Sequence, residues 1–137
     1  MGSPRPLTKK QVMDHLLKSK DLQELDMRGI DLSGLNFDGA NLRFSKLAEC
    51  NLNRATFRGA DLTGASLWHS DCKDAVFDGA LLEEADFDFS YLEGTTFKDA
   101  RIKKTVFPFG RVSLDQIQDS VRSGRKVKME RSRFEDE

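Results

Sequence analysis

Histidine, serine, aspartate and cysteine are the side chains of this sequence that could carry out nucleophilic or metal chemistry. His69, Ser70 and Asp71 are consecutive and contain the three residue types of a serine hydrolase triad. Consecutive side chains on an extended stretch point to alternating faces, however, so these three cannot converge on one reacting atom. The other histidine, His15, lies in a separate segment that is predicted to be helical. We therefore expect no catalytic site, and the chain is predicted not to be an enzyme.

The elements that position these residues follow from a five-residue period. Every fifth residue from Leu22 to Phe107 is apolar without a break, eighteen positions in all. Steps of five spread around an α-helix and alternate between the faces of a strand, so neither element explains the pattern. A chain that turns a corner every five residues does explain it. We call the apolar residue of each pentad its centre.

A second period of twenty residues lies on the first. Phe37, Phe57, Phe77 and Phe97 are all centres, and each is followed three residues later by alanine. Four pentads per coil would place these phenylalanines directly above one another inside a four-sided rod. The small residues two before each centre point to the same inner side. The sequence therefore predicts an all-β solenoid of about four and a half coils, with neighbouring coils about 4.8 Å apart.

The pentads resemble the A(D/N)LXX motif of the pentapeptide-repeat family. Close matches begin at Ala40 (Ala-Asn-Leu), Ala60 (Ala-Asp-Leu) and Ala85 (Ala-Asp-Phe), and the resemblance extends over residues 21–110. It implies a right-handed quadrilateral β-helix, a handedness that the periodicity alone does not fix. Four positions depart from the motif because an apolar or aromatic residue replaces the usual polar one before the centre: Val76, Leu81, Tyr91 and Val106.

In this register both cysteines face inward. Cys50 and Cys72 are one coil plus two residues apart, which separates their Cα atoms by roughly 8 Å, beyond comfortable disulfide reach. No cluster of histidine and cysteine accompanies them, as a metal site would need. We therefore expect two buried thiols that act as small apolar groups, with no disulfide, no metal and no cofactor.

Two short helices are expected to cover the ends of the solenoid, which would otherwise be open edges. Thr8 with Gln11 and Ser113 with Gln116 form helix-start signatures, and each pair is followed by apolar residues at helical spacing. The predicted organisation is an N-terminal segment (1–20) with a capping helix over 9–19, the β-helix (21–110), a C-terminal capping helix (111–124) and a charged, mobile and solvated tail (125–137). In an alternative interpretation of the tail, its apolar residues Val127, Met129 and Phe134 bind a partner.

The composition argues against several classes of function. The net charge is −1 and the mean hydropathy is −0.55, so neither direct nucleic-acid binding nor membrane binding is expected. No apolar run reaches the length of a transmembrane helix, and the first twenty residues are too charged for a secretory signal. A cytoplasmic location is therefore expected. The charge is nevertheless uneven, because residues 61–100 contain ten acids against Lys73 and Lys98.

Aromatic side chains gather at one predicted corner of the rod. His69, Phe89 and Phe109 recur every twenty residues at a turn position, Trp68 precedes His69, and Tyr91 begins the next wall. Exposed aromatics beside acids are typical of protein-binding surfaces. In the alternative interpretation, Phe89 and Phe109 pack under the C-terminal helix and stabilise it. The candidate partner-binding residues are Trp68, His69, Phe89, Tyr91 and Phe109, with the acids Glu83, Glu84, Asp86 and Asp88.

The sequence favours a rigid, non-enzymatic protein-interaction module, a monomer or weak dimer, whose protein partner it does not identify. The family resemblance implies an alternative, because several bacterial members imitate duplex DNA and modulate DNA gyrase. The acidic stretch 71–99 has the charge sign that this role needs, whereas the near-neutral total charge does not favour it. A third interpretation is a structural domain of a larger protein, which would contact another domain of its own chain.

Overall fold

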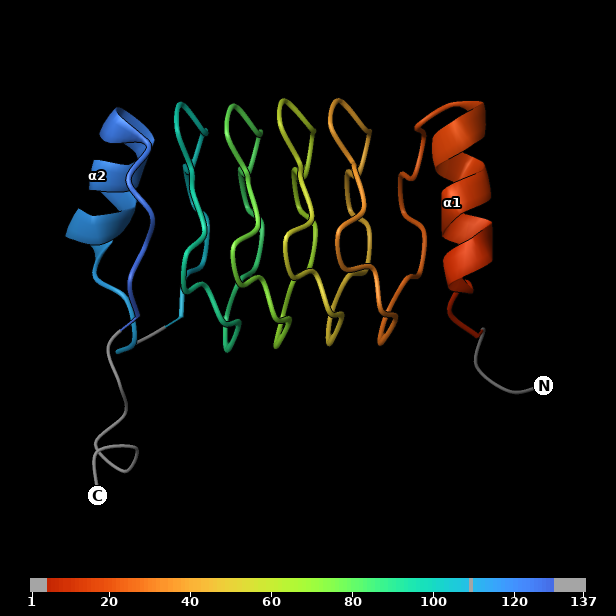
Figure 1. The fold of residues 1–137 in the computed structure, drawn as a ribbon, viewed down its shortest axis with the longest axis horizontal. Helices are drawn as coiled ribbons and strands as arrows, with labels where there is room; N and C mark the ends of the chain where they lie inside the picture. The colour runs from red at the N-terminus through yellow and green to blue at the C-terminus, as the bar shows by residue number, and fades with distance from the viewer. Residues whose placement is uncertain (1–4, 109, 130–137) are drawn as a thin grey trace, which may run out of the picture.

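The structure, a computed structural model, describes residues 5–108 and 110–129, which form one rod. The coils lie side by side between two helices (Figure 1), with α1 (Lys9–Lys18) beside the first coil and α2 (Leu114–Ser123) beside the last. Within these ranges the strands are single bridged residues, spaced every five positions from Asp21 to Val106. Corners therefore interrupt every wall of the rod before a longer strand can form.

Parallel bridges join the residue before each centre to the residue twenty positions later, so that Asn41 bridges both Asp21 and Asp61. The Leu42 N–H donates to Asp61 O at 2.7 Å, and the Asp61 N–H donates to Ala40 O at 3.0 Å. Each inner coil is thus hydrogen-bonded to the coil on either side. The predicted twenty-residue period is confirmed.

Four walls make up each coil, and we number them by their first centres. Wall 1 contains Leu22, wall 2 Met27, wall 3 Leu32 and wall 4 Phe37, each with its equivalents every twenty residues. The chain turns from one wall to the next at the residue two after the centre, which has a positive φ, as at Gly39 (70°). These corners have the geometry of β-turns that need a positive φ at their third residue.

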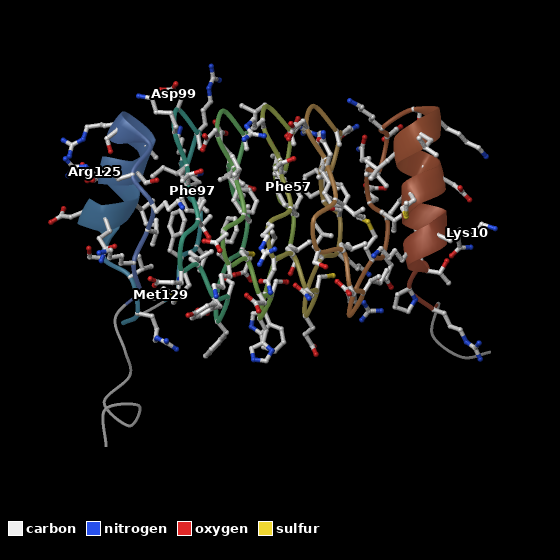
Figure 2. The ribbon with its side chains drawn as sticks, viewed as in Figure 1. Lys10, Phe57, Phe97, Asp99, Arg125 and Met129 are labelled. Atoms are coloured by element: carbon white, nitrogen blue, oxygen red, sulfur yellow. The ribbon has the colours of Figure 1, made fainter. Side chains whose placement is uncertain are left out.

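The core is a set of vertical stacks inside the four walls. Phe37, Phe57, Phe77 and Phe97 are fully buried, and their successive ring centroids are 4.9, 4.7 and 5.5 Å apart with nearly parallel planes. Phe57 and Phe97 are labelled inside the rod in Figure 2. The predicted contact between phenylalanines twenty residues apart is confirmed. Such aromatic pairs add about 0.5–1.5 kcal/mol each beyond their burial.

Helix α1 begins with the expected capping box. The Thr8 hydroxyl accepts from the Gln11 N–H, while the Gln11 side chain accepts from the Thr8 N–H. Val12 of this helix is fully buried and belongs to the core. The first coil has bulky apolar residues at its second inward position, and these are partly buried against the core: Leu25, Ile30 and Leu35.

Helix α2 covers one wall of the last coil. Ser113 is its N-cap and Gly124, with a φ of 78°, is its C-cap. The Phe97 N–H donates to the Ser120 hydroxyl at 3.0 Å, and the Asp99 N–H donates to Val121 O at 2.9 Å. Backbone donors at the end of wall 4 are therefore satisfied by this helix.

The prediction of a solvated tail is wrong for residues 125–129, which pack against the last coil. Val127 is 1% exposed, its N–H donates to Thr95 O at 2.9 Å, and its C=O accepts from the Gly94 N–H at 2.8 Å. The segment runs beside α2 (Figure 1), and Met129 is labelled beside the last coil in Figure 2. Val127 and Met129 are two residues apart, so both can point to the core from an extended segment. Phe134 lies outside the described residues.

Within the described part of the chain, neither helix has the length and apolar character that crossing a bilayer requires.

Candidate interaction site

Three aromatic rings meet at the corner between walls 2 and 3. Trp68 lies edge-on to Phe89, with ring centroids 6.0 Å apart at 74°, and its ring centroid is 5.2 Å from that of His69. Trp68 is 39% and Phe89 66% exposed. We call these three residues the aromatic corner. Because these rings are exposed on the outer side of a buried core, the aromatic corner is the first candidate for a binding surface.

The backbone fixes the orientation of the aromatic corner. His69 and Phe89 occupy equivalent corners with φ values of 57° and 58°. The His69 N–H donates to Asp88 O at 2.9 Å, so the two coils are joined directly beneath the rings. The rings consequently project from a hydrogen-bonded ladder rather than from a loose loop.

One of the two interpretations of Phe89 is wrong. A phenylalanine packed under α2 would be buried, whereas Phe89 is among the most exposed large apolar residues of the described chain. Phe109, the other residue in that interpretation, lies outside the described residues. The position of Phe89 therefore leaves its ring available to a partner.

A groove of about 560 Å³ borders the aromatic corner. One of its lining residues, Ser90, is buried, and its hydroxyl donates to Phe87 O. The Asp88 carboxylate accepts from the Phe89 N–H at 3.1 Å and carries a negative charge into the groove. The lining residues are His69, Asp88, Phe89, Ser90, Pro108 and Arg111.

The other predicted site residues are spread over walls 1, 2 and 3. Tyr91, which is 39% exposed, bridges Asp71 on wall 3. Asp86 is partly buried and accepts from the Asp88 N–H at 2.8 Å, so its carboxylate serves a turn. Of the four predicted acids, only Asp88 lines the groove.

Glu83 and Glu84 belong to wall 1 and its corner with wall 2. Both are exposed, and the equivalent positions one coil later are Lys103 and Lys104. The Glu84 N–H donates to Lys103 O at 3.2 Å, which joins the two rows directly. The charges of Glu83 and Glu84 therefore lie next to lysines of the following coil and are not concentrated beside Trp68.

The structure separates the residues of the apparent triad. Ser70 is 1% exposed and its hydroxyl donates to Leu47 O at 2.5 Å, whereas the His69 ring is in the outer groove. No group of three or more histidine, cysteine or acidic side chains in residues 5–108 and 110–129 could hold a metal ion.

Both cysteines are free and buried. Burial raises the pKa of the Cys50 thiol, and the same cause raises the pKa of Cys72 further above its ordinary value. Cys50 Sγ donates to Met27 O at 2.8 Å. A raised pKa keeps both groups as protonated thiols, which are poor nucleophiles.

The sequence analysis missed three residues of the groove. Pro108 is the equivalent of Trp68 and Asp88 in the twenty-residue register, so the column of these residues could have identified it. Ser90 lies two residues before the centre Leu92, a position that the register predicts to face inward and not into a surface groove. Arg111 follows the last pentad, where the register ends and gives no position.

These features define a class of protein. The chain is a repeat solenoid with a stacked core, and its candidate site is a surface formed by outward positions of successive coils. A family model described as pentapeptide repeats matches residues 36–67, 60–99 and 70–107 with eight copies. The matched residues make up more than half of the chain, which belongs to the pentapeptide-repeat family.

Three solved structures are similar to this rod. A pentapeptide repeat protein from Nostoc PCC 7120 is 28% identical with a TM-score of 0.67, over 78% of this chain and 91% of that chain. One from the thylakoid lumen of Arabidopsis thaliana is 31% identical with a TM-score of 0.59, over 61% and 57%. This chain thus spans a little over half the length of the Arabidopsis protein.

HetL, a pentapeptide repeat protein involved in heterocyst differentiation regulation in Nostoc sp. strain PCC 7120, is 29% identical to this chain. Its TM-score is 0.51, over 68% of this chain and 47% of that chain. No curated protein matches this chain in sequence. The comparisons therefore establish the family and its β-helical fold.

Proposed function

We propose that this chain is a non-enzymatic protein-interaction module that binds a partner protein through the aromatic corner. The observation that carries the proposal is the contact between two exposed rings, Trp68 and Phe89, on a rigid corner of the rod. Large aromatic side chains dominate the binding energy of many protein interfaces.

The rigidity of the aromatic corner supports this role, because side chains that must become ordered on binding reduce the affinity for a partner. An immobilised side chain costs about 0.5–1.5 kcal/mol on association if it was mobile before. Here Trp68 already contacts both His69 and Phe89, and the backbone below is joined by the bond from His69 to Asp88. The aromatic corner therefore needs little further ordering when a partner binds.

The charges beside the aromatic corner favour a cationic group on the partner. Asp88 lines the groove, and Glu49 occupies the corner one coil before His69. An arginine or lysine over the Trp68 ring would gain a cation–π contact with acids close by. A partner segment that combines an apolar and a basic side chain is consequently the best match to this surface.

The test is capture of partners from a lysate of the source cells with wild-type chain and a Trp68→Ala/Phe89→Ala variant. Ala48 occupies the column of Trp68, so alanine is compatible with that position. The matched control is Phe44→Ala, which removes another exposed phenylalanine at a positive-φ corner, between walls 1 and 2.

We expect a specific partner to be retained by wild type and the Phe44→Ala control and lost by the double variant. Circular dichroism melting would verify that all three proteins are folded. If the folded double variant retains every specific partner, the aromatic corner is not the binding surface.

The DNA-gyrase role and the structural-domain role stay as predictions from the sequence. The DNA-gyrase role needs a continuous acidic surface. The structural-domain role needs a second domain in the same polypeptide.

A further inference from the structure

The last coil of the rod is closed over only half of its perimeter. In the coil before it, each centre on walls 1 and 2 donates its N–H to the next coil. Leu82 N donates to Arg101 O at 2.9 Å, and Phe87 N donates to Val106 O at 2.8 Å. The corner residue Glu84 donates in the same way to Lys103 O.

Walls 3 and 4 of the last coil keep this pattern by using later parts of the chain. The Gly94 N–H donates to Val127 O at 2.8 Å on wall 3. On wall 4 the acceptors for the corresponding donors are the Ser120 hydroxyl and Val121 O of α2. The C-terminal segments therefore replace the missing next coil on two walls.

On walls 1 and 2 the equivalent donors lack such acceptors. Among the described residues, the backbone N–H groups of Ile102, Lys104 and Phe107 have no hydrogen-bond partner. We call residues 101–107 the open edge. A row of unpaired backbone groups at the end of a β-structure is a template for pairing with another extended segment.

The open edge also exposes part of the apolar core. Leu82 and Phe87 are fully buried, whereas Ile102 and Phe107, one coil later, are only partly buried. Phe107 stacks on Phe87 at 5.8 Å, but its other side has no ring from a further coil in the described chain. An added strand with apolar inward residues would complete both stacks.

The charges of the open edge indicate which side chains an added strand should carry. The outward positions of the last wall 1 row are Arg101, Lys103 and Lys104, and all three are exposed. Opposite charges on neighbouring strands are favourable, and like charges directly opposite are unfavourable. The added segment should therefore carry acids on either side of an apolar residue.

We propose that the open edge binds an extended acidic segment of a partner protein, with the pattern acid–apolar–acid, as one further β-strand of the rod. The apolar residue covers Ile102, the acids lie opposite Arg101 and Lys103, and the backbone of the segment accepts from the unpaired N–H groups. This surface is separate from the aromatic corner, so the two proposals succeed or fail independently.

The test uses the full chain and a fluorescein-labelled peptide, acetyl-ELEGTEFE-amide, which continues the row over 101–107 with acids at its outward positions. The peptide acetyl-KLKGTKFK-amide is the matched control, with equal length and apolar content. Fluorescence anisotropy measures binding. Amide hydrogen exchange measures protection of Ile102, Lys104 and Phe107, which a merely electrostatic contact would not change.

We expect the acidic peptide to bind and to protect these three amides, and the basic peptide to do neither. Lys103→Glu/Lys104→Glu should weaken binding about tenfold, because the favourable pair at Lys103 becomes repulsive and the substitution at Lys104 places a second negative charge beside it. Glu84 adopts nearly the same positive φ as Lys104, so the corner accommodates glutamate. Because the new acids lie opposite Glu83 and Glu84, circular dichroism should verify that this variant is folded. The matched charge-reversal control, Arg54→Glu/Lys73→Glu on wall 3, should bind normally.

Four results would overturn the proposal. Protection of the three amides before peptide is added, and its loss after truncation behind Met129, would show that the chain's own C-terminus fills the edge. Protection that rises with protein concentration alone would show that a second copy fills it. Failure of both peptides to bind would mean that the lysines serve only to prevent strand pairing. Equal binding of both peptides would show that charge does not select the segment.

Discussion

The phenylalanine stack shows how a single residue position controls this fold. Phe57 lies between Phe37 and Phe77 at 4.9 and 4.7 Å, with interplanar angles of 4° on both sides. Removing this ring would leave a void that neighbours held by hydrogen-bonded coils cannot fill. The stability of the rod therefore depends on each member of the stack.

Phe57→Ala should lower the free energy of unfolding by about 3–5 kcal/mol, as expected for a fully buried aromatic residue. Urea unfolding followed by circular dichroism measures the change. Phe44→Ala is the control, since Phe44 is 48% exposed and should cost far less. Equal losses for both variants would contradict the assignment of Phe57 to the stacked core.

The two cysteines should be unreactive in the folded rod. Their pKa values are raised by burial, so little thiolate exists at mildly alkaline pH, and reagents cannot reach the sulfur atoms. Ellman's reagent should therefore modify neither thiol in the native chain and both after unfolding in denaturant. Rapid modification of native protein would show that the coils open locally around Cys50 or Cys72.

At the residue scale the sequence predicted burial accurately where neighbouring coils exist on both sides. Centres from Leu22 to Phe97 are fully buried as the five-residue period indicated, but Ile102 and Phe107 are only partly buried. The period continues through these two residues, so the sequence pattern alone does not distinguish them. Their exposure results from the absence of a further coil over walls 1 and 2 in the described chain.

Hydrogen bonds within a turn contribute to the pH dependence of stability, as Asp61 shows. Burial alone would raise the pKa of Asp61, but hydrogen bonds from Thr63 and Arg43 outweigh it and lower the pKa below its usual 3.8. The Thr63 hydroxyl donates to Asp61 at 2.6 Å and Arg43 donates at 3.1 Å. In an unfolded chain these bonds are lost and the carboxyl is protonated more readily.

A depressed pKa in the folded state contributes stability above the unfolded value of 3.8, and this contribution is lost as the pH falls through the folded value. The wild-type free energy of unfolding should therefore fall as acid is added below about pH 5. Asp61→Asn should flatten this dependence while keeping the turn, since Asn41 forms the same turn one coil earlier. Urea midpoints measured across this range provide the slopes, and identical slopes would contradict the prediction.

The elements at the two ends differ in how much of them could be predicted. Both helices have polar N-caps three residues before glutamine, and they begin close to the expected positions. The segment containing Val127 was not predicted, because two alternating apolar residues in a basic run are too few to indicate a strand. The coil beneath gives that segment its structure, because the Gly94 N–H and the Thr95 carbonyl both hydrogen-bond to Val127.

Across the whole molecule, the five-residue register predicted which side chains point outward, but it did not predict which outward side chains contact one another. His69 and Phe89 are equivalent positions on adjacent coils, so their proximity followed from the twenty-residue period. The large Trp68 side chain contacts both of them. Glu83 and Glu84 are close to Asp88 in sequence, yet a corner of the rod separates them from its groove. Distance along the chain is therefore a poor guide to surface composition in a solenoid whose direction changes every five residues.

The arrangement of charge over the whole rod leads to the last prediction, which concerns DNA gyrase. Duplex DNA presents about one negative charge per 1.7 Å of its axis, without interruption. Here the acids alternate with bases along the rod: Arg58 pairs with Asp38 at 3.6 Å on wall 4, and Arg43 pairs with Asp61 on wall 1. We expect micromolar chain to leave gyrase supercoiling of relaxed plasmid unchanged, measured by gel electrophoresis. Inhibition or protection that Glu83→Lys/Glu84→Lys abolishes would contradict this expectation and would favour DNA mimicry by the acidic half of the rod.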